Sequence, residues 1–179
     1  MLYSLSLFNE RQEGFVRIFD SEREKCPQPD GLPIFPRGIT GFGGADTEPT
    51  LFLDEKVFHR MCYALARANG GTVAEVDTDI TTRNFYFAKI CRYGDFVFLL
   101  QNAHAPYAAF ARQDTSGGFV LTQQPEWLQV PEGPVRFLSL AEQNQDWHGL
   151  CGELSPEELE QIRYWNAQTV GEIIWNHWD

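Results

Sequence analysis

The sequence predicts an α+β fold in which an antiparallel β-meander sheet packs against one longer helix, with two short C-terminal helices. Three observations support this prediction. Two apolar stretches are each interrupted by a turn, one long stretch has helical periodicity, and two short stretches near the C-terminus open with a capping box. With 179 residues, 43% of them hydrophobic, the chain can bury a core of its own. We therefore treat residues 1–179 as a single domain.

The N-terminal part predicts two strands and a long loop. LYSLSLF at residues 2–8 alternates apolar and polar residues, and GFVRIFDSE at residues 14–22 has the same character. Residues 26–50 contain five prolines and five glycines, which indicates an irregular Pro/Gly-rich loop. Loops of this length in a compact domain are often functional.

The clearest helix is expected at residues 53–71, LDEKVFHRMCYALARANGG. Asp54 is suited to cap its start, and Gly70 and Gly71 to end it. Its apolar positions share one helical face: Val57, Phe58, Met61, Cys62, Leu65 and Ala68. The opposite face carries His59, Arg60, Tyr63 and Arg67, which is either an ordinary solvated surface or a contact for an anion or a partner.

The middle of the chain predicts the strands of the meander. TVAEV at residues 72–76 is a short strand, and residues 84–102 form a hairpin that turns at residues 93–95. Residues 106–124 form a second hairpin that turns at residues 114–118. The stretch VRFLSL at residues 135–140 either adds a short strand or opens a helix.

A helical pair is expected over residues 153–179. Ser155 and Thr169 each stand three residues before a glutamate, the spacing of a capping box. The buried stripe of the first helix is predicted to be Leu159, Ile162 and Trp165. In the second helix the spacing places five residues on one apolar face: Val170, Ile173, Ile174, His177 and Trp178. His177 on this face is expected to be a neutral core histidine, and the alternative is a buried acid or base with a shifted pKa.

Charge is distributed unevenly along the chain. The net charge is −11, and the 67 residues 113–179 hold 11 acids against two bases, a net of −9. Glutamates at helix N-termini have a local explanation, since they interact favourably with the helix dipole. We find no such explanation in the sequence for Glu142, Asp146, Glu153, Glu160 and Asp179. A field of this sign repels nucleic acid and attracts a basic protein or a cation, although ordinary solubility is the simpler reading.

The sequence contains no strong catalytic or metal-binding motif. Its four cysteines form no C-x-x-C pair, which argues against a zinc ribbon, and the first residues lack the pattern of a signal peptide. We expect reduced thiols, a cytoplasmic location and no membrane span. A cysteine-dependent enzyme would use Cys151 with His148, His59 or His104 as the base. A small-ligand-binding domain with a pocket in the meander is the other alternative.

The ending IRYWNAQTVGEIIWNHWD resembles the C-terminal helical pattern of small bacterial immunity proteins from toxin–immunity loci. The resemblance covers about the last 20 residues. It implies a cytoplasmic, non-catalytic protein that neutralises a basic toxin domain by binding it. Glu153, Glu157, Glu160 and Asp179 are the partner-binding residues we predict, with no catalytic, cofactor-binding or metal-binding residues and no nucleic-acid partner. The oligomeric state is left open.

Overall fold

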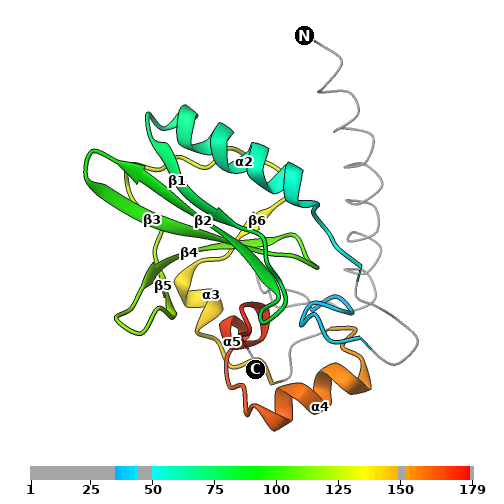
Figure 1. The fold of residues 1–179 in the computed structure, drawn as a ribbon. Coiled ribbons are helices and arrows are strands. Elements are labelled where there is room, and N and C mark those ends of the chain that lie inside the picture. Colours follow the sequence, from blue (N-terminus) through cyan, green and yellow to red (C-terminus); the bar gives the residue numbers. More distant parts are fainter. Residues whose placement is uncertain (1–34, 44–49, 149–151, 178–179) are drawn as a thin grey trace.

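The computed structural model describes residues 35–43, 50–148 and 152–177. There the chain forms an antiparallel sheet with helices on both faces (Figure 1), which confirms the predicted α+β fold. The strands expected at residues 2–8 and 14–22 lie outside the described residues. Of the predicted loop, residues 35–43 and 50 are described, and a hydrogen bond from the Gly41 N–H to the Gly38 carbonyl closes a turn at residues 38–41.

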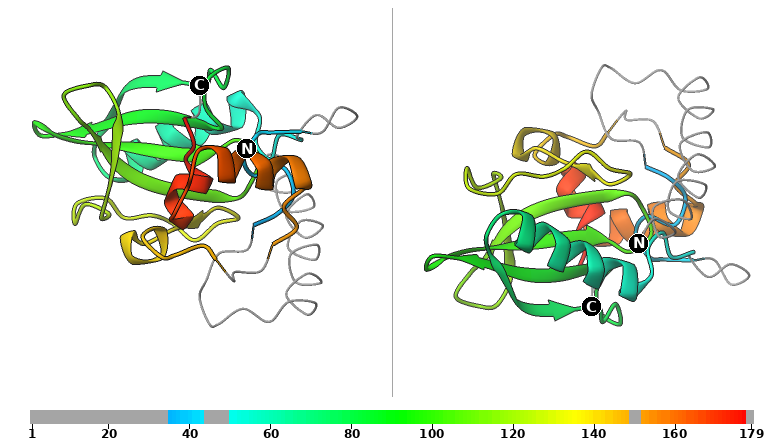
Figure 2. Two further views of the ribbon diagram at one scale, coloured as in Figure 1. Left: turned by 90° about the horizontal axis from the view of Figure 1, so that it is seen from below. Right: turned by 90° about the horizontal axis from the view of Figure 1, so that it is seen from above.

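Helix α2 (Glu55–Ala68) covers one face of the sheet, as the right-hand view of Figure 2 shows. A carboxylate oxygen of Asp54 accepts a hydrogen bond from the Val57 N–H at 2.8 Å, and the helix ends at Asn69. Gly70 follows with a φ of 66°, the left-handed conformation that favours glycine. The buried residues of the helix are Phe58, Cys62, Leu65 and Ala66. Ala68, which was predicted to lie on the apolar face, is exposed, and Ala66 is buried although it was not predicted to be.

Five strands follow one another in the order β1-β2-β3-β4-β5, each antiparallel to the last. Their bounds are β1 Thr72–Asp77, β2 Phe85–Arg92, β3 Asp95–Asn102, β4 Tyr107–Gln113 and β5 Phe119–Thr122. The two hairpins turn where the sequence predicts. In the first, Tyr93 and Gly94 both have positive φ, which matches the twist of the flanking strands. In the second, Asp114 accepts hydrogen bonds from the N–H groups of Ser116 and Gly118.

The stretch at residues 135–140, predicted to add a short strand or to open a helix, contributes to both. Strand β6 (Arg136–Phe137) pairs in parallel with β4, and helix α3 (Leu140–Gln143) follows directly. Ser139 caps α3 and forms a capping box with Glu142.

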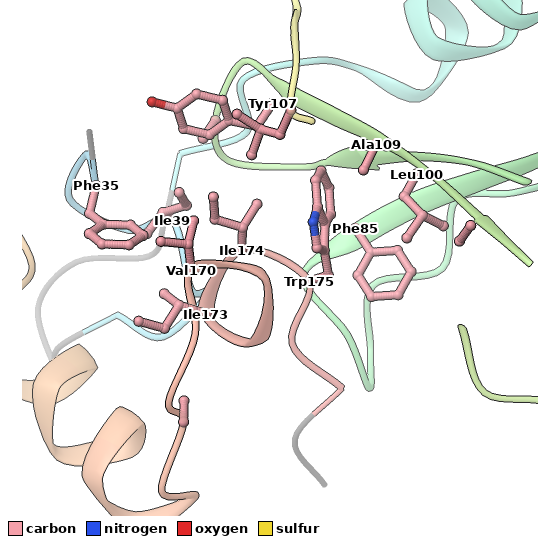
Figure 3. Packing of buried hydrophobic residues seen from close by; sticks show 14 of the residues in the cluster. Phe35, Ile39, Phe85, Leu100, Tyr107, Ala109, Val170, Ile173, Ile174 and Trp175 are labelled. Atoms are coloured by element: carbon pink, nitrogen blue, oxygen red, sulfur yellow. The ribbon is translucent and has the colours of Figure 1, made fainter. Parts of the chain in front are cut away.

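The second face of the sheet is covered by the short C-terminal helices α4 (Pro156–Tyr164) and α5 (Val170–Ile174), seen from below in Figure 2. Both begin with the predicted capping boxes. Ile174 and Trp175 face strand residues Phe85 and Leu100 in this core (Figure 3). The Trp175 indole N–H donates to the side-chain oxygen of Gln143 at 2.8 Å, so its polar atom is satisfied on burial.

The end of α5 differs from the prediction. The helix stops at Ile174, and Trp175 leaves helical geometry with φ −116° and ψ 55°. The face drawn through His177 is therefore wrong: His177 is exposed, whereas Trp175 and Asn176 are buried. Helical spacing does not apply beyond the last turn, so it does not predict which of the side chains after Ile174 are buried. Trp178 lies outside the described residues.

The turn at residues 38–41 lies between α4 and the sheet and is held by buried polar side chains. The Ile39 carbonyl accepts from Asn84 at 2.8 Å and from Asn102 at 3.1 Å. The Thr40 carbonyl accepts from Asn176 at 2.7 Å. These amides satisfy backbone groups that burial would otherwise leave without partners.

Candidate functional site

Helix α4 is oriented by a buried glutamate. Glu158 is fully buried and accepts hydrogen bonds from the backbone N–H of Ser155, the N–H groups of Gly38 and Thr40, and the Thr40 hydroxyl, at 2.9 to 3.2 Å. One carboxylate therefore completes the capping box and also binds the turn at residues 38–41. This fixes which side of α4 faces the protein.

The opposite side of α4 is an acidic stripe. Glu157, Glu160 and Tyr164 stand at positions i, i+3 and i+7, which share one face of a helix, and all three are exposed. Glu153, just before the helix, is exposed as well. No described cation forms an ion pair with these carboxylates.

Two exposed aromatic side chains lie at the C-terminal end of α4: Tyr164 within the stripe, and beside it the C-cap residue Trp165. Tyr164 is 76% exposed and Trp165 39% exposed, and their ring centroids lie 5.3 Å apart in an edge-to-face arrangement. Asn166 follows with a φ of 55°, which turns the chain back toward the core. The prediction that Trp165 belongs to the buried stripe is therefore wrong. We define the α4 surface as Glu153, Glu157, Glu160, Tyr164 and Trp165.

One cation lies on the same helix as the α4 surface. Arg163 is exposed in the last turn of the helix, where a cation interacts favourably with the dipole. The pKa of Glu157 is lowered by hydrogen bonds from the Glu157 backbone N–H and from the Ser155 side chain, together with the charge of Arg37. Glu157 is therefore ionised at neutral pH.

Two of the acids without an explanation in the sequence have structural roles. Glu142 completes the capping box of α3 and forms an ion pair with Arg136. Asp146 accepts a hydrogen bond from the His148 N–H at 2.9 Å, which lowers the pKa of Asp146. The acidic surplus available to a partner is thus smaller than the sequence indicated. Within the described residues it includes Glu153, Glu157 and Glu160 at α4, together with exposed acids elsewhere such as Glu126 and Glu132.

The structure brings together three of the four predicted partner-binding residues, Glu153, Glu157 and Glu160. Asp179 lies outside the described residues. Sequence reasoning missed the exposed aromatic pair, because it assigned Trp165 to the core. The available signal was Asn166, a residue type that tolerates the left-handed conformation and so marks the end of the helix.

The structure describes the histidines of the cysteine-dependent enzyme alternative but not its cysteine. Cys151 lies outside the described residues, so this hypothesis stays a prediction. His148 is exposed and its Nδ1 lies 2.6 Å from an Asp146 oxygen. His59 lies on α2, and His104, in the loop after β3, has its pKa lowered by burial. Burial raises the pKa of the Cys62 thiol to about 12, so Cys62 is a packing residue.

The ligand-binding alternative also stays a prediction. A hollow of about 430 Å³ lies on the outer face of α2 instead of within the meander, and its lining includes Arg60, Tyr63 and Arg67. The described part of the chain contains no group of three or more potential metal ligands. It also contains no helix with the length and apolarity that a membrane span requires.

Comparison of the chain with protein-family models, curated proteins and solved structures gives no match. The functional argument therefore rests on the geometry of the site.

Proposed function

We propose that this protein is a non-catalytic binding protein that neutralises a basic toxin domain by direct contact with the α4 surface. The observation that carries the proposal is the combination on one short helix of an exposed acidic stripe with an exposed Tyr164–Trp165 pair. Carboxylates steer a basic partner toward the surface, and aromatic side chains supply the contacts that hold it. The C-terminal resemblance to immunity proteins points to the same class of partner.

The two kinds of side chain have different kinetic roles. Exposed rim charges act mainly on the association rate and its salt dependence, whereas contacts that lose water on binding act on the dissociation rate. The backbone of α4 is held by Glu158, so the surface is preorganised before a partner arrives.

The test begins with capture of the partner from the native host, followed by association kinetics at two salt concentrations. Glu153→Lys combined with Glu160→Lys should slow association by about tenfold and flatten its salt dependence. Trp165→Ala should instead raise the dissociation rate. Glu157 is kept in these variants, because it lies in the first turn of α4 and supports the helix.

The matched control is Glu126→Lys combined with Glu132→Lys. Both of these acids are exposed and lie away from α4, and the change in net charge is the same. The control should retain most of the association rate. An acidic partner, equal losses in the two charge variants, or a captured toxin whose activity is unaffected by the protein would refute the proposal.

A further inference from the structure

The outer face of α2 carries a second charged surface, of the opposite sign to α4. Arg60, Tyr63 and Arg67 follow one another at spacings of three and four residues and so form a stripe along two turns. All three are exposed, Tyr63 by 51%. Among the described residues neither arginine is in an ion pair. We call these three residues the α2 stripe.

The α2 stripe borders the hollow of about 430 Å³ described above. Its other lining residues are His59 and the small, exposed Ala64 and Ala68. Small side chains between longer ones allow a second chain to approach the helix closely. Positions 60 and 67 are separated by about 10 Å along the helix axis, a spacing that matches two carboxylates two turns apart on a helical partner.

The charge around the stripe limits the length of its ligand. A second hollow shares His59 and Arg60 and is lined further by Asp54, Glu55 and Lys56, so the charge beyond Arg60 is mixed. Strand β1, which packs beside α2, contributes the exposed Glu75. A long polyanion would meet these carboxylates, in a chain of net charge −11. A short acidic segment would not.

We propose that the α2 stripe binds an acidic segment of a second polypeptide, with Arg60 and Arg67 pairing with its carboxylates and Tyr63 packing between them. This site lies on the face of the sheet opposite α4 (Figure 1), so it is independent of the function proposed above. The protein would then have two partners, a basic one at the α4 surface and an acidic one at the α2 stripe.

The probe for the test is a fluorescein-labelled, alanine-based helical peptide with glutamates along one face. Fluorescence anisotropy at low salt should show binding that Arg60→Ala with Arg67→Ala weakens by about tenfold or more. Tyr63→Ala should weaken it as well. Alanine is a good helix former, so these variants should keep the fold, which circular dichroism would verify.

The control variant is Arg112→Ala, which removes an exposed arginine from β4 and should leave the peptide affinity unchanged. Four outcomes would overturn the proposal: equal binding of a peptide with glutamine in place of glutamate, an equal loss in Arg112→Ala, tighter binding of a single-stranded oligonucleotide at the stripe, or sedimentation showing that a second copy of this chain occupies it. Glu153→Lys with Glu160→Lys should retain peptide binding, so failure at α4 is distinguishable from failure here.

Discussion

Glu158 shows how hydrogen bonds can satisfy a buried carboxyl group. Its two carboxylate oxygens accept from three backbone N–H groups and one hydroxyl. Burying a polar group is costly unless hydrogen bonds replace those it made with water, and these donors do so. The sequence identified Glu158 as a capping residue, but the donors from the turn at residues 38–41 come from far along the chain and have no local signal.

Replacement of Glu158 by glutamine tests this arrangement. The amide group would place N–H donors against the donors of Gly38, Thr40 or Ser155, leaving buried groups without acceptors. We expect Glu158→Gln to lower the free energy of unfolding by about 2–4 kcal/mol. Glu160→Gln, an exposed change on the same helix, should alter it by less than about 0.5 kcal/mol. Urea denaturation of both variants is the measurement, and equal effects would contradict the account.

Glu142 provides a prediction for pH. Burial disfavours its charged form, but hydrogen bonds from Ser139 and the nearby Arg136 outweigh this effect and lower the pKa of Glu142 from 4.5. A carboxyl whose pKa is lower in the folded state stabilises the fold above its unfolded pKa, and this contribution is lost as the pH falls through the folded value.

Glu142→Gln should therefore destabilise the protein by roughly 0.5–1 kcal/mol at pH 7, and the difference should shrink below pH 4.5. Glutamine can keep the capping box through its side-chain oxygen, but its NH2 group cannot accept from Arg136, so the variant removes the charge and the ion pair together. Urea denaturation across this pH range is the measurement. A difference that persists at acidic pH would show that packing, not the charge, is responsible.

At the level of elements, local signals predicted the fold well. The hairpin turns at residues 93–95 and 114–118 and the capping boxes at Ser155 and Thr169 depend on neighbouring residues, and all four are confirmed. The errors lie where helices end. Helical periodicity predicts buried positions as far as Trp165 and His177, but both residues lie beyond the last helical residue and are exposed. The left-handed conformation of Asn166 marks the end of α4.

We predict opposite effects on stability for the replacement of Trp175 and of Trp165. Trp175 is buried, meets Phe85 edge-on at 6.2 Å and donates to Gln143. Trp175→Ala should therefore cost about 3–5 kcal/mol of stability, measured by denaturation. Trp165→Ala, at a partly exposed position, should change stability little while weakening partner binding. If Trp165→Ala is the more destabilising of the two, the assignment of core and surface is wrong.

For the molecule as a whole, the sheet separates two surfaces of opposite charge, the acidic α4 surface and the basic α2 stripe (Figure 1). The sequence indicated both: the first from the charge of residues 113–179, the second from the outward face of the longer helix. It could not show that Glu142 and Asp146 have structural roles, because their partners become evident only once the chain folds.

The turn at residues 38–41 also has a consequence for the order of events during synthesis. Its backbone N–H groups bind a carboxylate up to 120 residues later in the chain, and its Thr40 carbonyl binds Asn176, 136 residues later. A ribosome releases the turn and the strands long before these partners exist. The nascent protein therefore carries the backbone groups of Gly38 and Thr40 still in water until Glu158 and Asn176 have been synthesised. Until then the apolar face that α5 covers stays open, and this is the interval in which a chaperone would have a surface to hold.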